Sequence, residues 1–244
     1  MASLLVLWDV DQTLISANGA GRAIYEVAFR EMFGRELPAA SAAVPMAGRT
    51  DRAIALDILT GAGIADARDQ IDKFQAIQAG HAPALADRIR ARGRVLPGVP
   101  AALAAVARGR PGVRGRPGVR VIQSVLTGNV RSMADVKLAS LGLTRHLDLD
   151  AGAYGTESEI RADLVPVAQR HAAARYGEDF SGARTVLVGD TPLDVEAALV
   201  AGARAVGVAT GGFSAEDLAE AGAHAVLDDL SDTALALRAI LGPP

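Results

Sequence analysis

Two carboxylates follow the first apolar run of the sequence. Asp9 and Asp11 come directly after Leu4–Trp8, with a single residue between them. Two acids at the end of a buried strand can divide the work of catalysis, one as the nucleophile and the other as the proton donor. The same residues also suit an acidic turn that caps a helix, and the chain has 28 acidic residues, so this motif alone leaves both interpretations open.

A second acidic pair follows a later apolar run. Asp190 and Asp194 come after Thr185–Val188. They are four residues apart, so both can face one pocket from the first turn of a helix. Hard oxygen ligands from two strand ends suit Mg²⁺. The segment is also typical of a helix start, with Asp190 or Thr191 as N-cap and Pro192 in the first position, and both interpretations can hold together.

A third polar group stands at the end of another apolar run. Thr127, Gly128 and Asn129 follow the run that begins at Val119. A hydroxyl and a small flexible residue at a strand-to-helix turn can present main-chain N–H groups to a phosphate. On its own this motif is weak evidence for a phosphate site. It is stronger evidence together with the two acidic pairs, because all three groups follow strands of one predicted sheet.

The elements that must position these groups are visible as short apolar runs separated by helical patterns. Continuous apolar runs predict strands buried on both faces, at Leu4–Trp8, Val119–Leu126, Thr185–Val188 and Ala205–Val208. Weaker strand predictions fall at Leu147–Leu149 and Ala225–Leu227. Helical patterns lie at about 98–107, 130–141, 163–175, 193–201, 215–221 and 231–241. This alternation predicts an α/β fold with a Rossmann-like parallel sheet covered on both faces.

One long segment breaks the alternation. Residues from about 16 to 92 have helical patterns only, with breaks at Gly34–Pro38, near Gly48 and at Gly61–Gly63. Pro97-Gly98 then restarts the alternation of strands and helices. The sequence therefore predicts a discontinuous core, residues 1–15 and 93–244, with an all-helical cap domain over residues 16–92.

The overall composition excludes several classes of protein. The 244 residues are half hydrophobic, enough for a large core, and the net charge of -3 gives no general reason to bind nucleic acid or an anionic membrane. No apolar run approaches the roughly 18–20 residues of a membrane span. The absence of cysteine excludes disulfides, thiolate metal sites and a cysteine nucleophile. We expect a cytoplasmic protein with no nucleic-acid or membrane partner.

A short tandem repeat interrupts the predicted core. The hexapeptide GRPGVR occurs at Gly109–Arg114 and again at Gly115–Arg120, and five arginines lie between residues 108 and 120. The repeat could form an anion-binding arm. The simpler interpretation is a solvated loop lengthened by duplication, because loops tolerate such insertions at small cost.

Taken in order, the polar strand ends resemble the motifs of the haloacid dehalogenase superfamily. Its motifs are a DxDx[TV] after the first strand, a Ser or Thr ending the second, a Lys or Arg opening a later helix, and a closing GDxxxD. Three of these four motifs are matched by Asp9, Asp11, Thr13, Thr127, Asp190 and Asp194. The resemblance covers the whole chain, including a helical insert after the first motif. The phosphoglycolate phosphatase-like and β-phosphoglucomutase-like branches are the most similar.

The chain departs from the family pattern at two points. Gln12 stands where the family often has glycine, which bears on the turn and not on the chemistry. Neither lysine of the chain, Lys73 or Lys137, stands where the third motif would place one. Arg161, just before the predicted helix at 163–175, is the best candidate for that role, and its planar fork suits phosphate oxygens. The alternative is a solvated arginine at a helix start.

The resemblance implies a mechanism and a metal site. Asp9 would attack phosphorus and form an aspartyl-phosphate, and Asp11 would protonate the leaving oxygen and later deprotonate a water. Mg²⁺ would be held by Asp9, by the main-chain carbonyl of Asp11 and by Asp190, with Asp194 acting through water or by orientation. The predicted phosphate-binding residues are Thr127, Gly128, Asn129 and Arg161.

The predicted cap offers one further candidate. Arg49, in Met46–Asp51, resembles a residue of the loop that related caps lower over the substrate, where it would meet a second anionic group. An ordinary interhelical turn with Thr50 or Asp51 as N-cap explains the same residues and is the simpler interpretation.

The resemblance therefore predicts a hydrolase that acts on a small phosphorylated metabolite, and it leaves a homodimer open. A phosphomutase of the β-phosphoglucomutase type uses the same four motifs and differs chiefly in the cap. A non-catalytic phosphate-binding protein of this fold is the alternative from another class, but it predicts a lost acid, whereas all four expected carboxylates are present.

Overall fold

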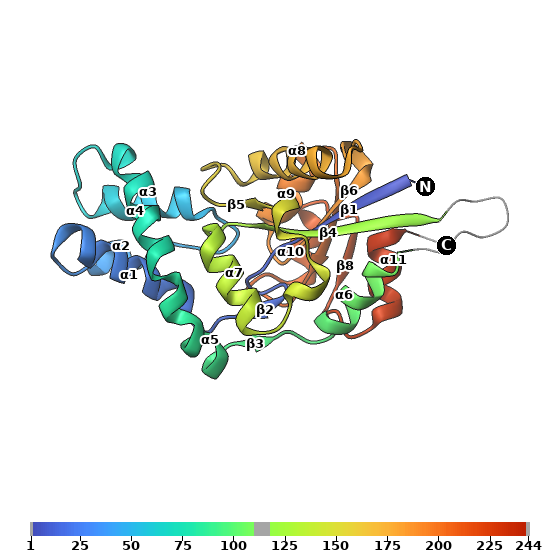
Figure 1. Ribbon diagram of the computed structural model, residues 1–244, viewed down its shortest axis with the longest axis horizontal. Coiled ribbons are helices and arrows are strands. Elements are labelled where there is room, and N and C mark those ends of the chain that lie inside the picture. The colour runs from blue at the N-terminus through green and yellow to red at the C-terminus, as the bar shows by residue number, and fades with distance from the viewer. Residues whose placement is uncertain (1, 110–117, 243–244) are drawn as a thin grey trace.

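A six-stranded parallel sheet forms the centre of the protein (Figure 1). The computed structural model describes residues 2–109 and 118–242. The strand order is β5-β4-β1-β6-β7-β8, so the first strand of the chain lies in the middle. The strands are β1 (Ala2–Trp8), β4 (Val119–Thr127), β5 (Ala153–Tyr154), β6 (Thr185–Gly189), β7 (Arg204–Val208) and β8 (Ala225–Leu227). The α/β fold class is confirmed.

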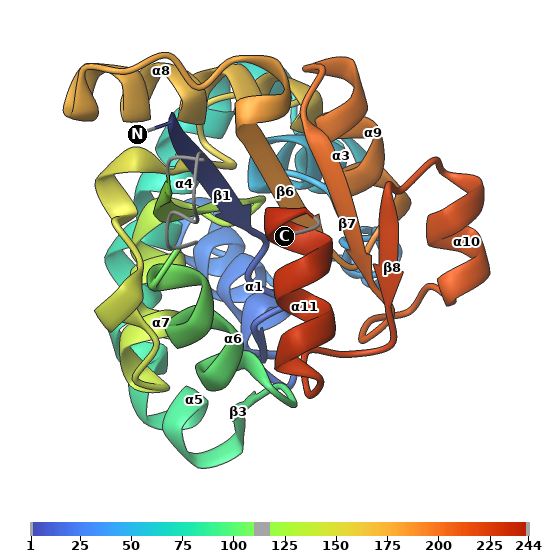
Figure 2. The ribbon, with the colours of Figure 1, turned by 90° about the vertical axis from the view of Figure 1, so that its right-hand side faces the viewer.

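Helices cover both faces of this sheet (Figure 2). They are α6 (Val99–Ala107), α7 (Arg131–Ser140) and α11 (Thr233–Leu241) on one face, and α8 (Leu164–Tyr176), α9 (Pro192–Val200) and α10 (Ala215–Glu220) on the other. The alternation of β1 explains the two layers, because Val6 and Trp8 pack into one hydrophobic cluster while Leu5 and Leu7 pack into the other. Burial on both sides accounts for the continuously apolar sequence of β1.

A helical segment follows β1 and stands beside the sheet (Figure 1). Its helices are α1 (Ala20–Phe33), α2 (Ala39–Ala42), α3 (Asp51–Gly61), α4 (Ala67–His81) and α5 (Ala86–Arg92). They bury a third hydrophobic cluster, built around Tyr25, Phe29 and Phe74, which also includes Met133 of α7. The helical character predicted for this stretch is confirmed, while its status as a separate cap domain with the stated boundaries stays a prediction.

Two connections join the sheet to the helical segment, and the backbones of these two connections are hydrogen-bonded to each other. The short strands β2 (Ile15–Ser16) and β3 (Arg94–Val95) form a two-stranded antiparallel sheet in which Ile15 pairs with Val95 and Ser16 with Arg94. The segment therefore leaves and rejoins the rest of the chain at one place.

Of the two weaker strand predictions, one is confirmed and the other is wrong. The strand predicted at Ala225–Leu227 is present as β8. The strand predicted at Leu147–Leu149 is wrong, because Asp148 accepts a hydrogen bond from Asp150 N through its side chain and starts a 3₁₀ turn over Leu149–Ala151. The edge strand beside β4 is instead the two-residue β5, which is too short for its pattern to be seen in the sequence.

Two further sequence observations can be placed. The GRPGVR repeat falls largely on residues 110–117, so the prediction about it lies outside the described residues. Within the described ranges, no helix is long and apolar enough to cross a membrane.

Candidate active site

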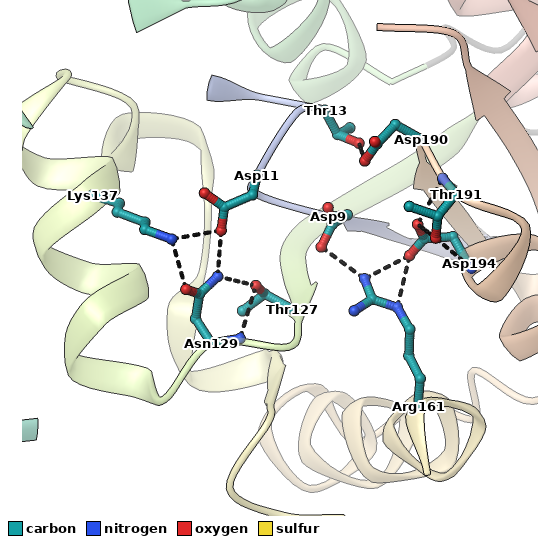
Figure 3. Close-up of polar contacts among 10 residues, drawn as sticks. All are labelled: Asp9, Asp11, Thr13, Thr127, Asn129, Lys137, Arg161, Asp190, Thr191 and Asp194. Carbon is teal, nitrogen blue, oxygen red and sulfur yellow. Dashed lines mark hydrogen bonds and ion pairs between the residues drawn. The ribbon is translucent and has the colours of Figure 1, made fainter. Parts of the chain in front are cut away.

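The polar residues singled out in the sequence meet at the carboxyl ends of three neighbouring strands. Asp9 follows β1, Thr127 is the last residue of β4, and Asp190 follows β6. Since β4, β1 and β6 lie side by side and run parallel, their ends bring these side chains to one edge of the sheet (Figure 3). This is the edge at which open α/β sheets form their ligand sites.

Three carboxylates form a buried cluster there. Asp9, Asp190 and Asp194 each place an oxygen within 4.8 Å of the others. Burial raises the pKa of Asp9 to about 7, with the Arg161 guanidinium opposing the shift and the neighbouring acids adding to it. Burial and then the charge of Asp9 raise the pKa of Asp190 to about 8. Such a cluster of acids, all oxygen donors, is a site that a divalent cation would stabilise.

Arg161 joins two members of this cluster. It begins a short 3₁₀ turn, Arg161–Asp163, that leads into α8, and its side chain is only 5% exposed. Its Nη2 donates to Asp9 Oδ1 at 2.7 Å, and its Nε and Nη2 donate to Asp194 Oδ1 at 2.9 and 2.6 Å. Burial alone would lower the pKa of Arg161, but the charges of Asp194 and Asp9 outweigh it and raise that pKa. Arg161 is therefore a buried cation beside the proposed nucleophile, and the alternative of a solvated arginine is wrong.

Asp194 also belongs to the start of α9. Asp194 Oδ2 accepts hydrogen bonds from the main-chain N–H and the hydroxyl of Thr191, and Thr191 Oγ1 accepts from Asp194 N. This is a capping box with Pro192 in the first turn of the helix, as the sequence predicted for Thr191. Both oxygens of Asp194 are thus engaged by the protein, which fixes the carboxylate in place beside Arg161.

A second polar network surrounds Asp11 on the other side of Asp9 (Figure 3). Asp11 Oδ2 accepts from Lys137 Nζ at 2.6 Å and from Asn129 Nδ2 at 2.7 Å. Asn129 Nδ2 also donates to Thr127 Oγ1 at 2.7 Å, and Asn129 Oδ1 accepts from Lys137 Nζ at 2.7 Å. The network ties Asp11 to the turn after β4 and leaves Oδ1 of Asp11 outside these bonds.

Lys137 is a residue of the site that the sequence alone did not reveal. Lys137 lies on α7 and its side chain is only 2% exposed, so it brings a buried cation to the site opposite Arg161. The sequence does carry an indication that Lys137 is buried, because it lies at helical spacing among Met133, Ala134 and Leu138, which form an apolar stripe. A charge in such a stripe needs a partner, and only the folded chain shows that the partner is Asp11.

The turn after Asp9 accommodates Gln12 in an uncommon conformation. Gln12 has a φ of 62°, in the left-handed region that favours glycine. The bonds that hold this turn include those from Thr13 Oγ1 to Asp190 Oδ1 at 3.1 Å, from Thr210 Oγ1 to the Gln12 carbonyl, and from Gln12 N to the Ile15 carbonyl. The glycine that the family often has at this position suits the same backbone conformation.

The start of α3 lies against the turn after β4. Asp51 N donates to the Gly128 carbonyl at 2.6 Å, and Asp51 Oδ2 accepts from Val130 N at 2.7 Å. A Cβ on Gly128 would lie 1.9 Å from the carbonyl oxygen of Arg49, so no larger residue fits there without moving the two backbones apart. The helical segment is therefore closed over the site in this structure.

The side chain of Arg49 is bonded to other groups of the helical segment. Its guanidinium donates to Asp57 Oδ2 at 2.6 Å and to the Pro45 carbonyl at 3.1 Å. Thr50 is the N-cap of α3 and accepts from Ala53 N, as the simpler interpretation of this segment predicted. Arg49 lines the cavity described next, and its contact with a substrate stays a prediction.

A cavity of about 290 Å³ connects these groups. Its floor is formed by the strand-end residues and by Lys137 and Arg161. Its other wall comes from the helical segment and consists largely of small or apolar residues, namely Ala17, Gly19, Gly21, Ile24, Met46 and Ile54. A cavity of this size is at the small end of the range of ligand pockets in proteins.

Comparison with known proteins identifies the fold. Residues 161–233 match the Hydrolase_like family model, described as HAD-hydrolase-like. A haloacid dehalogenase-like family protein from Streptococcus pneumoniae has a TM-score of 0.59 at 14% identity, covering 93% of this chain and 94% of that one. The chain therefore has the fold of haloacid dehalogenase-like proteins, and part of its core matches a family model of that kind.

Two other solved structures of similar fold have titles that name a phosphatase and a phosphoglucomutase. A "predicted phosphatase" from Clostridium acetobutylicum has a TM-score of 0.64 at 17% identity, covering 95% of this chain and 96% of that one. A "putative beta-phosphoglucomutase" from Thermotoga maritima has a TM-score of 0.57 at 20% identity, covering 99% of this chain and 100% of that one. Among curated proteins, none matches the chain. At these identities the similarity shows the fold alone, and the activity has to be argued from the site.

Proposed function

We propose that the protein is a Mg²⁺-dependent phosphatase that hydrolyses a small phosphomonoester through an aspartyl-phosphate on Asp9. The observation that carries the proposal is the position of Asp9 between two networks. Arg161 and the acid cluster lie on one side, and Asp11 with Asn129 and Lys137 lies on the other. A nucleophile, a separate acid and two buried cations around one cavity fit phosphoryl transfer, in which positioning and charge stabilisation dominate.

The residues present fit a divalent cation. Asp9 and Asp190 are the candidate ligands through their carboxylates, with Asp11 offering its main-chain carbonyl and Asp194 held beside them by Arg161 and Thr191. The raised pKa values of Asp9 and Asp190 indicate that their negative charges are poorly compensated by the protein alone. When bound, the cation supplies charge neutralisation that lets a carboxylate approach an anionic phosphate.

In the first half of the proposed reaction, a carboxylate oxygen of Asp9 forms a bond to phosphorus as the bond to the leaving oxygen breaks. Asp11 gives its proton to that leaving oxygen. The donors for the phosphoryl oxygens are Arg161, the hydroxyl of Thr127 and the N–H groups of the turn at Gly128. Asn129, also predicted to bind phosphate, already uses both N–H groups of its side-chain amide on Asp11 and Thr127 and would have to give up one of these bonds. Arg161 already donates to Asp9, so it is placed to stabilise charge at the point of attack.

In the second half, water attacks the phosphorus of the aspartyl-phosphate. Asp11 takes a proton from that water, the bond from phosphorus to Asp9 breaks, and inorganic phosphate leaves. The hydrogen bonds from Lys137 and Asn129 hold Asp11 in one orientation through both halves. One acid therefore serves in turn as proton donor and as base.

Phosphate release from p-nitrophenyl phosphate, and from a panel of alkyl phosphates, tests the proposal. We expect release with Mg²⁺, and its loss both with excess chelator and with Asp9→Asn. Full activity in chelator would overturn the metal assignment, and full activity of Asp9→Asn would overturn the nucleophile.

A phosphomutase is the second candidate, since it shares the strand-end residues. The two activities differ in what accepts the phosphoryl group from Asp9. In a phosphatase the phosphoenzyme decays in water, whereas in a mutase it decays slowly in water and faster when a sugar phosphate is added. The decay rate of phosphoenzyme with and without a sugar phosphate separates the two.

A further inference from the structure

Gln12 lies in the turn between Asp11 and Thr13 and has a backbone conformation that disfavours a side chain. Its φ is 62°, where residues other than glycine are uncommon. Its N–H donates to the Ile15 carbonyl at 2.6 Å, and its carbonyl accepts from Thr210 Oγ1 at 2.5 Å. Glycine would make both bonds without the strain, because both use the backbone alone. A glutamine side chain kept in such a conformation beside a catalytic group points to a function of that side chain.

The side chain of Gln12 lines the cavity next to Asp11. Its Nε2 donates to Ser16 Oγ at 3.3 Å, and among the described residues its Oε1 accepts no hydrogen bond. Asn129 is also a side-chain amide beside Asp11 (Figure 3), but its oxygen already accepts from Lys137 at 2.7 Å. Oε1 of Gln12 is therefore an available acceptor beside the proposed acid–base residue.

The carboxylate of Asp11 offers a second acceptor, since its Oδ1 lies outside the bonds from Lys137 and Asn129. A water that attacks phosphorus gives one hydrogen to its base. Its other hydrogen needs an acceptor as well, if a lone pair of the water is to point at phosphorus. A carboxylate and an amide oxygen on successive residues meet this need. In other phosphoryl-transfer enzymes a glutamine orients the attacking water in this way.

We infer that Gln12 is a positioning residue for the second half of the reaction, in which its amide oxygen holds the water that hydrolyses the aspartyl-phosphate. This inference rests on the proposed function for the phosphoenzyme on Asp9. In that step the water oxygen forms a bond to phosphorus, the bond from phosphorus to the Asp9 carboxylate breaks, and one water proton passes to Asp11. Gln12 exchanges no proton and holds the other hydrogen of the water. The first half has no attacking water, so Gln12 acts on the second half alone.

Separate measurement of the two half-reactions tests the inference. Each protein would be mixed rapidly with p-nitrophenyl phosphate and Mg²⁺, so that p-nitrophenol reports formation of the phosphoenzyme and inorganic phosphate reports its hydrolysis. Gln12→Met keeps the length of the side chain and removes the amide. We expect it to form the phosphoenzyme within about threefold of the wild-type rate and to hydrolyse it about 10- to 100-fold more slowly, the scale of misplacing a reacting group. A burst of p-nitrophenol and a lower KM should accompany the slower hydrolysis.

Gln12→Gly separates the side chain from the backbone conformation. Glycine suits a φ of 62°, so this variant should unfold at a higher temperature than the wild type and still hydrolyse the phosphoenzyme as slowly as Gln12→Met. Gln12→Glu keeps an acceptor oxygen at the same reach and should retain part of the hydrolysis rate. Asp66→Gly is the matched control, because Asp66 also has a positive φ, of 52°, but is exposed and does not line the cavity. Asp66→Gly should leave both rates unchanged.

Hydrolysis of the phosphoenzyme at the wild-type rate in Gln12→Met or Gln12→Gly would overturn the inference. Equal slowing of both half-reactions would also overturn it, because a general disturbance of the turn would affect both. Either result leaves the phosphatase in place. A wild-type protein that forms no phosphoenzyme and releases no phosphate would instead overturn the proposed function, and the role of Gln12 with it.

Discussion

Lys137 Nζ lies 2.6 Å from Asp11 Oδ2 and joins a helix on one face of the sheet to the acid that follows the central strand. Asn129 closes the arrangement, because it bonds to Lys137 through its carbonyl oxygen and to Asp11 through its amide. The orientation of Asp11 therefore depends on a residue ten positions beyond the end of β4.

Replacing Lys137 with methionine should lower kcat about 10- to 100-fold for alkyl phosphates, since small misplacements of a catalytic group cost on that scale. KM should change less, because Lys137 acts through Asp11 and not on the substrate. Lys137→Arg should restore part of the rate. Lys73→Met is the control, as Lys73 is the other lysine of the chain and is exposed. A large rise in KM with kcat kept would show instead that Lys137 binds substrate.

Asp11→Asn should slow alkyl phosphates by about the 10²–10⁴ of general acid–base catalysis. An aryl phosphate should lose less in its first step, because its leaving group is stable as an anion. Water would still lack its base in the second step, so rapid mixing should show a burst of phenol followed by a stall. The same experiment with Asp9→Asn should show no burst. Equal slowing of both substrate types without a burst would remove Asp11 from the acid–base role.

Arg161→Ala should cost about 10²-fold or more in kcat/KM, the scale of losing one preorganised donor to developing charge. It should also destabilise the fold by about 3–5 kcal/mol, because Asp9 and Asp194 lose their shared buried partner. Arg161→Lys should retain part of the activity and part of the stability. Arg170→Ala, on the exposed surface of α8, controls for loss of an arginine. A nearly silent Arg161→Ala would mean that another cation serves the phosphoryl group.

The stability of the metal-free protein should depend on pH through Asp9 and Asp190. Their pKa values are raised by burial from 3.8 to about 7 and about 8, so the folded state keeps protons that the unfolded state has lost. The free energy of unfolding should therefore fall as pH rises from about 4 to about 8. Thermal unfolding in chelator between pH 5 and 8 measures this.

Added Mg²⁺ should raise the midpoint of unfolding more at pH 8 than at pH 5, since it competes with those protons for the same carboxylates. Asp190→Asn should flatten the pH dependence. A midpoint that is constant with pH in chelator would contradict the raised pKa values.

The strand ends were predictable because buried parallel strands are apolar throughout and deliver their last residues to one edge of the sheet. Asp9, Thr127 and Asp190 could therefore be grouped by the apolar runs that precede them, and Arg161 could be placed by its position before a helix. Lys137 could not, because its partner Asp11 lies 126 residues away in the chain. The spacing of residues on a helix shows which face is buried but not what that face meets.

The antiparallel pair of Ile15 with Val95 and Ser16 with Arg94 has a consequence for how this protein can diverge. Because the helical segment leaves and returns at a single point, its helices can lengthen, shorten or be exchanged as one piece without separating the sheet strands on either side. One contact limits such changes, since the start of α3 must keep its fit against Gly128. Substitutions in the helical segment away from that contact can therefore alter the wall of the cavity while the strand ends keep their positions.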